Sequence, residues 1–259
     1  WAGVLSGCCH HRLGLYPVDD PYYLTMIDCI SVENMRRSDA LTIKNHVPSL
    51  ELMRRAAKGV YLACAWTAPV AILVGSGNNG GDGFALACIL QEQNIDCTVF
   101  TLSQRFSEDS AFYAQKACEM GVKIQPFAEP CLQGFAMVVD CLLGTGFRGG
   151  LRENYRGAIE AINASHAYVV SVDINSGMNG DDGSAELAVR SDLTVTIGYV
   201  KRGLLTENAG RHIGRLVCVD IGIVLEKEEW KVCAAWESLA ENGIRCPNWL
   251  DMQRINAIL

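Results

Sequence analysis

Residues Val70 to Leu90 read VAILVGSGNNGGDGFALACIL, an apolar run followed by a glycine-rich segment and a second apolar run. The first run, Val70 to Val74, predicts a strand that is covered on both faces, as in a parallel sheet. The glycines from Gly75 onward are expected to allow positive φ and close approach of the backbone to a ligand. The helix predicted from Asp82 to Gln93 would direct its first N–H groups at an anion. This layout predicts a phosphate-binding turn.

Residues Gly75 to Gly80 also match the G-x-G-x-x-G fingerprint of dinucleotide-dependent dehydrogenases. That class needs an acid at the end of the next strand to bind a ribose hydroxyl. The next predicted strand, Cys97 to Thr101, ends without an acid, because Asp96 stands at its beginning. A redox dehydrogenase is therefore disfavoured. The glycine-rich segment instead carries side-chain oxygens suited to a cation or a polar ring as well as phosphate: Asn78, Asn79 and Asp82.

The composition fits one intracellular α/β protein. The chain has 259 residues, of which 49% are hydrophobic, and no Ser/Pro-rich or single-charge run divides it. The formal net charge of -7 argues against nucleic-acid binding, which requires clustered Lys and Arg. The longest apolar run, Val60 to Val74, is too short to span a bilayer, and no signal segment opens the chain. We expect no membrane association and a cytoplasmic location, with organelle targeting left open.

The cysteine pattern favours free thiols in a reducing compartment. The 12 cysteines are scattered and form no C-x-x-C pair, so a disulfide framework is not indicated. The run Cys8-Cys9-His10-His11 contains metal-binding residue types. Adjacent ligands do not easily close a tetrahedral zinc site, so we do not expect a structural metal there.

Strand and helix patterns alternate along the chain. This alternation predicts a Rossmann-like three-layer α/β/α fold with a mostly parallel sheet, and such sheets bind ligands at the carboxyl ends of their strands. The expected helices are Ser31 to Asn45, Ser49 to Trp66 with Ser49 as N-cap, Asp82 to Gln93, Ser107 to Met120, and Asn154 to Ala164. The expected strands are Val70 to Val74, Cys97 to Thr101, one near Val122, Ala136 to Cys141, Tyr168 to Asp173, Leu193 to Ile197, and Leu216 to Val219.

Three acids follow or end predicted strands and should gather at one edge of the sheet: Asp82, Asp140 and Asp173. Each taken alone is more consistent with a helix cap or a turn. All three, each beside glycines, favour a shared site. Because close carboxylates repel each other, either a cation lies among them or one acid stays protonated.

Three basic residues are candidates for the same edge. Arg148 and Arg152 are the cations nearest the loop that begins at Gly144, and guanidinium groups bind phosphate bidentately. A solvated surface role suits both arginines equally well. Lys201 follows another predicted strand end and is a further candidate on position alone.

Four segments occur in order: GSGNNGGDG (75–83), VDCLLGTGFRG (139–149), VDINSG (172–177) and TVTIGYVKRG (194–203). Together they resemble the YjeF N-terminal domain, the NAD(P)HX epimerases, over about Ile27 to Val224. Residues 1–26 would then form an N-terminal extension. Residues 225–259, with Trp230, Trp236 and Trp249, would form a tail without a counterpart.

The resemblance implies a Rossmann-like enzyme, usually a homodimer, that epimerises the C6 hydroxyl of hydrated NADH or NADPH. A separate ADP- or ATP-dependent dehydratase that accepts only the S form could then repair both epimers. The glycine-rich GxGD segment of that dehydratase is absent from this chain. The resemblance also implies a potassium ion beside the substrate, and amide, hydroxyl and carboxylate oxygens suit such a cation better than thiols do.

The resemblance assigns site residues by position. Substrate binding falls to Asn78, Asn79, Gly80, Gly81, Asp82, Gly144, Thr145, Gly146, Phe147, Arg148, Gly149, Gly150 and Asp173; potassium binding falls to Asn79, Asp140 and Ser176. Two residues depart from the family pattern, Asn175 and Arg202, which stand where Pro is usual or frequent. Both departures are expected to loosen a turn.

Asp140 is the predicted catalytic acid, exchanging a proton with the C6 hydroxyl or the ring while C6 becomes planar by ring opening or loss of water. Asp173 and Lys201 are the alternatives. A carboxylate in that role must be desolvated or crowded by other acids. A binding module is the competing function, because relatives of this domain serve as such in apolipoprotein A-I binding protein and in enhancers of messenger-RNA decapping. The intact Asn and Asp residues favour the enzyme.

Overall fold

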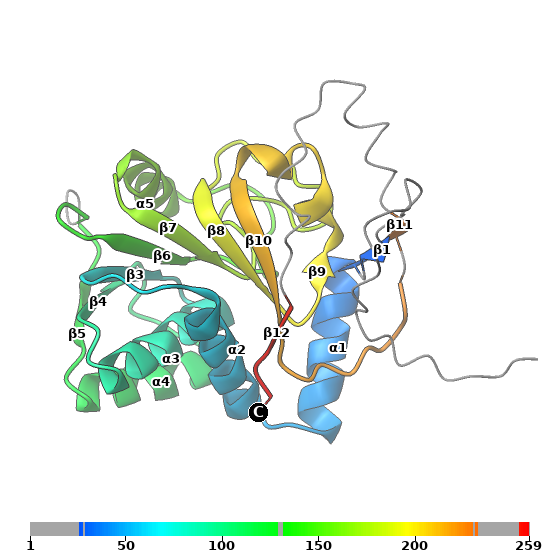
Figure 1. Ribbon diagram of the computed structural model, residues 1–259, viewed down its shortest axis with the longest axis horizontal. Helices are drawn as coiled ribbons and strands as arrows, with labels where there is room; N and C mark the ends of the chain where they lie inside the picture. The colour runs from blue at the N-terminus through cyan, green and yellow to red at the C-terminus, as the bar shows by residue number, and fades with distance from the viewer. Residues whose placement is uncertain (1–25, 28, 129–131, 230, 233–253, 259) are drawn as a thin grey trace, which may run out of the picture.

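The computed structural model describes residues 26–27, 29–128, 132–229, 231–232 and 254–258 (Figure 1). Its centre is an eight-stranded sheet in the order β12-β10-β8-β7-β6-β3-β4-β5, in which every neighbouring pair is parallel. The strands are β3 (Val70–Val74), β4 (Cys97–Thr101), β5 (Lys123–Pro126), β6 (Met137–Cys141), β7 (Tyr168–Val172), β8 (Ser191–Ile197), β10 (Ile213–Asp220) and β12 (Arg254–Asn256). The predicted fold class is confirmed.

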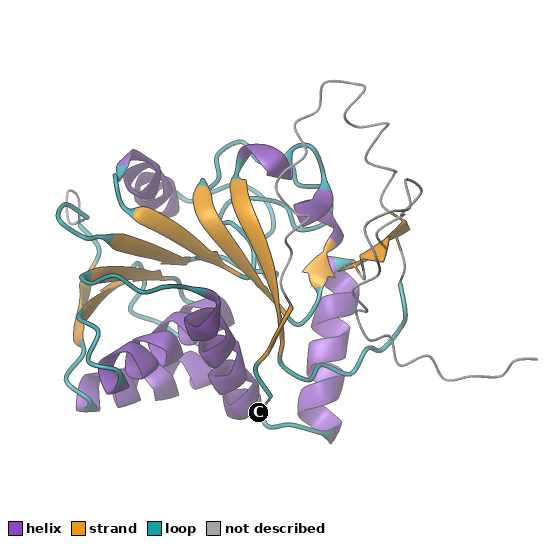
Figure 2. Ribbon diagram, viewed as in Figure 1, coloured by secondary structure: helices purple, strands orange, loops and turns teal. Residues whose placement is uncertain are grey.

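Helices cover both faces of the sheet (Figure 2). They are α1 (Val32–Asn45), α2 (Ser49–Ala63), α3 (Asn78–Glu92), α4 (Glu108–Glu119), α5 (Glu153–Ala164) and the short 3-10 helices η1 (Arg202–Leu205) and η2 (Ala209–Arg211). In Figure 1, α2, α3 and α4 lie on one face and α5 on the other. Strand β3 is buried on both faces. Ile72 belongs to a hydrophobic cluster that includes residues of α3, and Leu73 belongs to a second cluster that includes residues of α5.

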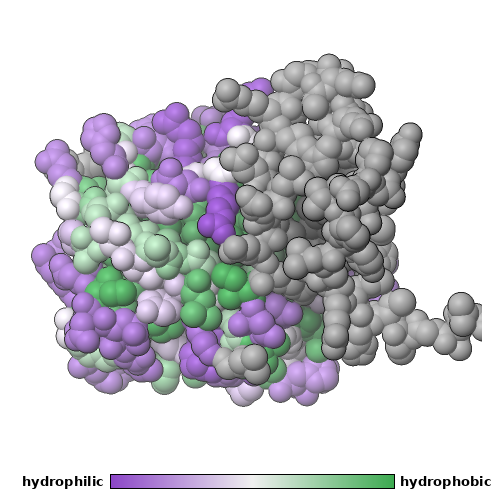
Figure 3. Space-filling model, in the orientation of Figure 1, coloured by the Kyte–Doolittle hydropathy of each residue, from purple (hydrophilic) through white to green (hydrophobic). Residues whose placement is uncertain are grey.

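Hydrophilic residues dominate the left and lower rim of the face in Figure 3, with apolar residues between them. Within the described ranges, none of the helices combines the length and the apolar character that a membrane span requires.

Helix α3 begins at Asn78, four residues before the predicted start at Asp82. Asn78 and Asn79 therefore lie in its first turn, and Asp82 lies in the second. Helix α2 also differs from the prediction. It ends at Ala63 instead of Trp66, and its N-cap is Pro48, so that the predicted N-cap Ser49 is the first residue of the helix. The glycines hid the true start of α3 because glycine is a poor helix former.

The glycine-rich segment is needed for close backbone packing. The expectation of positive φ was wrong, because the positive-φ glycines among the described residues all lie elsewhere in the chain. A Cβ on Gly75 would lie 2.0 Å from the Leu142 carbonyl oxygen, and one on Gly80 would lie 2.3 Å from the Gly75 carbonyl oxygen. Only glycine lets the start of α3 approach the ends of β3 and β6 so closely.

Two short strand pairs fasten the N-terminal segment to the rest of the chain. Strand β1 (Met26–Ile27) pairs antiparallel with β11 (Lys231–Val232), and β2 (Cys29–Ile30) pairs parallel with β9 (Val200–Lys201). Helix α1 follows β2 directly, so its start is fixed beside β9.

Helix α1 is also held along one side. Asn34, Ser38 and Thr42 are buried and spaced four residues apart, so they share one face of the helix. Asn34 Nδ2 donates to the Lys227 carbonyl at 2.6 Å. The Ser38 and Thr42 hydroxyls accept from the backbone N–H groups of residues 226 and 224, each at 2.9 Å. We call residues 224–229 the clasp. These bonds set the rotation of α1 about its axis.

The packing of Gly80 generates a test. Gly80→Ala should destabilise the protein by about 1–3 kcal/mol, because the new methyl group forces backbone apart in a close-packed region. Gly77→Ala is the matched control, since a Cβ there meets nothing within 4 Å. Urea unfolding measures both variants. Equal stability of the two would contradict the packing role of Gly80.

Candidate functional site

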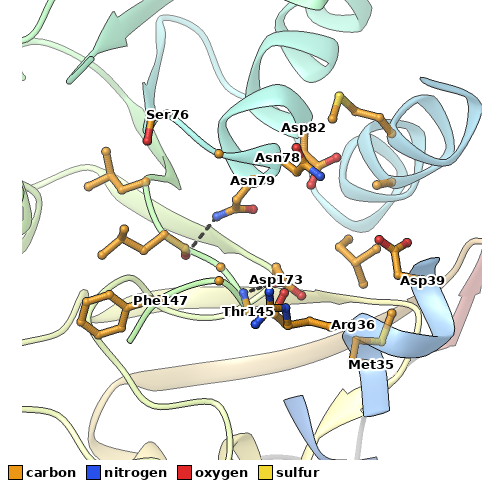
Figure 4. A pocket seen from close by; sticks show the side chains of 18 of the residues that line it. Met35, Arg36, Asp39, Ser76, Asn78, Asn79, Asp82, Thr145, Phe147 and Asp173 are labelled. Atoms are coloured by element: carbon orange, nitrogen blue, oxygen red, sulfur yellow. Dashed lines mark hydrogen bonds between the residues drawn. The ribbon is translucent and has the colours of Figure 1, made fainter. Parts of the chain in front are cut away.

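A cavity of about 560 Å³ opens at the carboxyl edge of the sheet, where the sequence placed a ligand site (Figure 4). Its walls come from the start of α3, the loop after β6, the ends of β7 and β8, and the faces of α1 and α2. The location agrees with the rule for ligands on parallel sheets.

Most of the predicted site residues line this cavity. They are Asn78, Asn79, Asp82, Gly144, Thr145, Gly146, Phe147, Arg148, Gly150, Arg152, Asp173 and Lys201. Five predicted residues do not line it: Gly80, Gly81, Asp140, Gly149 and Ser176. Gly80 and Gly81 are buried inside α3, where Gly81 faces Met53.

The N-terminus of α3 faces the cavity without a side-chain cap. Gly77 is the N-cap residue and offers no capping oxygen. Its neighbour Asn78 uses its side-chain oxygen to accept from the Ser107 hydroxyl at 2.7 Å. Free N–H groups and the helix dipole together favour an anion at this position.

Four oxygen-bearing groups meet beneath this helix start. Asn79 Nδ2 donates to the Leu143 carbonyl at 3.1 Å, and the Leu143 N–H donates to Ser176 Oγ at 2.8 Å. Ser176 Oγ in turn donates to Asp140. We call Asn79, Asp140, Leu143 and Ser176 the oxygen cluster. The Asn79 side-chain oxygen is buried and lacks a partner among the described residues, which is costly unless a ligand contacts it.

Asp140 is fully buried, and the chain satisfies its carboxylate. It accepts from the Leu142 N–H at 3.2 Å, the Ser171 hydroxyl at 3.0 Å and the Ser176 N–H at 2.9 Å, in addition to Ser176 Oγ. Burial raises the pKa of Asp140, and these hydrogen bonds oppose the shift. The structure therefore does not bring this predicted acid to the cavity wall.

Asp173 and Lys201 form a buried ion pair at the cavity wall. Lys201 is 0% exposed and donates to Asp173 Oδ1, to Thr196 Oγ1 at 3.2 Å and to the Ile197 carbonyl at 2.7 Å. The second Asp173 oxygen accepts from the Thr145 N–H at 3.1 Å. Asp173 also has a φ of 71°, a left-handed conformation that non-glycine residues adopt mainly under local constraint.

Two acids on the opposite side of the cavity have no partner among the described residues. Asp82 projects from α3 and Asp39 from α1 (Figure 4). Burial raises the pKa of Asp82 well above its ordinary value, and the charge of Asp173 adds to the shift. Burial and then Asp173 raise the pKa of Asp39 in the same way. Asp82 and Asp173 are crowded as expected, but Asp140 does not join them, and Asp39 is a member that the sequence did not indicate.

Asn175 does not loosen its turn, contrary to expectation. It is fully buried, and its amide nitrogen donates to the Val189 and His212 carbonyls at 3.0 and 2.9 Å. Its amide oxygen accepts from the Thr194 hydroxyl at 2.6 Å. Arg202 is likewise engaged, pairing with Asp181 at 3.1 Å. Both residues tie loops together in place of the family's prolines.

Helix α1 contributes site residues that the sequence did not reveal: Met35, Arg36, Asp39 and Ile43. Their helical spacing indicates only that the helix has a packed face. The pattern does not indicate that this face borders a ligand cavity, because the position of α1 depends on the pairing of β2 with β9.

The described cysteines are free thiols, as expected: Cys29, Cys64, Cys88, Cys97, Cys118, Cys141 and Cys218. Burial raises the pKa of Cys97 to about 12 and that of Cys64 to about 11, which makes these thiols unreactive. The run Cys8-Cys9-His10-His11 and the three tail tryptophans lie outside the described residues.

The fold and the cavity define a Rossmann-like α/β protein with an uncapped helix start and several acids at one sheet edge. A family model described as YjeF-related protein N-terminus matches residues 49–203, and the chain belongs to that family.

Curated relatives carry two kinds of name. An NAD(P)H-hydrate epimerase of Rhodopirellula baltica is 36% identical over 76% of this chain and 85% of the relative, and one of Limosilactobacillus fermentum is 34% identical over 74% and 95%. The bifunctional NAD(P)H-hydrate repair enzyme Nnr of Coxiella burnetii is 36% identical over 73% of this chain but only 40% of its own length. The chain thus spans less than half of the bifunctional relative.

The crystal structure of yeast ynu0, YNL200c, is similar in fold, with a TM-score of 0.61 and 21% identity. The match covers 68% of this chain and 83% of the yeast chain.

The raised pKa of Asp82 generates a pH-dependent test. Below about pH 3.9 the carboxyl is neutral in both the folded and the unfolded chain, so it has no effect on stability there. As pH rises, the unfolded chain ionises first, and the folded protein loses stability until its own raised pKa is passed. Asp82→Asn should therefore raise the melting temperature near neutral pH and lose this advantage at about pH 3.

The control for this test is Asp109→Asn, which removes another cavity-lining carboxyl. Asp109 lies in the first turn of α4, where a negative charge is favourable, so its loss should give no gain. The measurement is the melting temperature of the parent, of Asp82→Asn and of Asp109→Asn between about pH 3 and neutral pH. A gain for Asp82→Asn that does not change with pH would contradict the burial argument.

Proposed function

We propose that this protein epimerises the R and S forms of hydrated NADH and NADPH, the reaction for which its epimerase relatives are named. The observation that carries the proposal is the Asp173–Lys201 ion pair at the wall of a cavity whose other end is an uncapped helix start. The helix start suits a pyrophosphate. The ion pair supplies a carboxylate that can take and return a proton.

Asp173 is the proton-transfer group in this proposal, in place of Asp140. Asp140 faces four donors within the chain and does not line the cavity. Asp173 lines the cavity, and Lys201 holds its carboxylate in one orientation. The left-handed backbone at Asp173 fits a residue whose position is set by function.

A single group that takes up and returns a proton is sufficient for this reaction. The C6 hydroxyl of the substrate gives its proton to Asp173, a C6=O bond forms, and the C6–N1 bond breaks. Asp173 returns the proton to N1, which received the electron pair of that bond. Rotation about C5–C6 presents the other face of the aldehyde, and the reverse steps close the ring with C6 inverted.

The oxygen cluster is the proposed potassium site. It offers an amide oxygen, a carbonyl and a hydroxyl, ligand types that hard cations prefer. Asp140 accepts from four donors within the chain and would contribute its negative charge beside them. The Asn79 side-chain oxygen is buried and has no partner in the described part of the chain, which supports contact with a bound cation. A bound cation would supply positive charge near the substrate phosphates and offset the acids around the cavity.

We further propose that a separate dehydratase consumes the S form made here. The bifunctional relatives are named as hydrate repair enzymes, which supports coupling of two activities. A homodimer remains our expectation from the family. Free, buried thiols support a reducing compartment such as the cytoplasm.

The epimerase activity is tested with a mixture of R and S NADHX and an S-specific dehydratase. The parent protein should make the R form disappear faster than its spontaneous rate. Asp173→Asn should lower that rate by at least about a hundredfold, the usual effect of losing a general acid–base group, while still binding ADP-ribose.

Asp109→Asn is the matched control, because it removes an equal charge from the same cavity and should stay within a few-fold of the parent. Turnover of Asp173→Asn close to the parent, with loss in Asp140→Asn, would return the role to Asp140. No acceleration by the parent despite tight ADP-ribose binding would favour a binding module.

Potassium binding is tested by thermal unfolding in potassium chloride against choline chloride at equal ionic strength. A cation present at ten times its Kd stabilises the folded state by about 1.4 kcal/mol, a shift of about 3–6 °C for a protein of this size. Asn79→Ala should abolish the shift. Asn78→Ala is the control, because its oxygen is already bonded to Ser107. Equal melting of the parent in both salts would reject the site.

A further inference from the structure

Helix α1 lies outside the segment that the family model matches, residues 49–203. It nevertheless forms one wall of the cavity. Met35, Asp39 and Ile43, spaced four residues apart, line the cavity together with Arg36. The clasp binds a different stripe of the same helix, Asn34, Ser38 and Thr42. The direction in which Arg36 projects is therefore fixed by bonds that do not involve the cavity.

The cavity wall carries as many acids as bases, so it offers a phosphate no excess of positive charge. Its acids are Asp39, Asp82, Asp109 and Asp173, and its bases are Arg36, Arg148, Arg152 and Lys201. Lys201 already donates to three acceptors within the chain, so it has no N–H left for a ligand. The arginines are exposed at the cavity and have no ion pair among the described residues.

Arg36 differs from the other two arginines in its position. Arg148 and Arg152 belong to the segment that contains the Gly144 loop, whereas Arg36 comes from α1. In Figure 4 its side chain extends from α1 across the cavity toward Thr145 and Asp173. Asp39 lies one turn away on the same helix, but the two side chains form no ion pair. The guanidinium is thus directed at the space where the ligand would lie.

We propose that Arg36 is a substrate-binding residue that holds a phosphate group of the dinucleotide from the α1 side of the cavity. The proposal rests on the proposed function, because it takes the ligand to be a dinucleotide. The helix start of α3 would bind phosphate with backbone N–H groups, and Arg36 would approach it with a bidentate guanidinium. The phosphate is the pyrophosphate or, in the NADPH-derived substrate, the additional 2′-phosphate.

The test measures binding of two stable ligands by titration calorimetry. ADP-ribose carries the pyrophosphate, and 2′-phospho-ADP-ribose carries the extra phosphate as well. Arg36→Ala should weaken binding by about tenfold, the effect of losing one hydrogen-bonded charge. Arg36→Lys should recover only part of the loss, since a point charge lacks the bidentate geometry. An equal loss for both ligands assigns Arg36 to the pyrophosphate, and a loss for the second ligand alone assigns it to the 2′-phosphate.

Arg37→Ala is the matched control. Arg37 is the next residue of α1 and carries the same charge, and it forms exposed ion pairs with Glu33 at 2.6 Å and with Glu226 of the clasp at 3.8 Å. Its removal should leave both dissociation constants within twofold of the parent. The proposal is overturned if Arg36→Ala also binds within twofold of the parent, if Arg37→Ala weakens binding as much, or if the parent binds neither ligand.

The epimerase assay separates this proposal from the proposed function. In that assay Arg36→Ala should raise KM by about the same factor as the dissociation constant and leave kcat nearly unchanged. A parent protein that binds ADP-ribose through Arg36 but does not epimerise NADHX would reject the enzyme and keep Arg36 as a phosphate ligand.

Discussion

The buried ion pair between Lys201 and Asp173 is the interaction on which the geometry of the site depends. Lys201 joins the end of β8 to the end of β7, because it donates to Ile197 and Asp173 together. Asp173 in turn holds the loop after β6 through the N–H of Thr145. Lys201 also lies in β9, which pairs with β2 just before α1. Removing either charge would leave the other buried without compensation, at a cost of about 3–5 kcal/mol.

The sequence predicted the central sheet because its strands carry strong signals. Runs such as Val70–Val74 are apolar on both faces, and the glycine-rich segment marks where one of them ends. It also placed Asn79, Asp82 and Asp173 at one sheet edge, where the structure finds them. Strands of two residues, such as β2 and β9, carry no alternation that could be recognised. For that reason the return of α1 to the cavity, with Arg36 and Asp39, could not be predicted.

Other differences arise because residue type alone does not reveal hydrogen-bond partners. Asp140 looks like a catalytic acid at a strand end, yet Ser171, Ser176 and Leu142 satisfy it within the core. Asn175 looks like a loosening substitution, yet its amide joins distant loops. In both cases the partners lie more than ten residues away in the sequence, apart from Leu142, which is two residues from Asp140. Only the folded chain brings them together.

The contacts of α1 also have a consequence for the order in which the protein is built. Residues 29–45 leave the ribosome before the rest of the site, because the partners of β2 and α1, at 200–201 and 224–229, follow more than 150 residues later. A nascent chain can therefore assemble β3, β4 and β6 while the cavity still lacks one wall. Because contacts so distant in sequence form slowly, closure of the cavity by α1 is a late event of folding. The growing chain has no complete site until residues 224–229 have been synthesised.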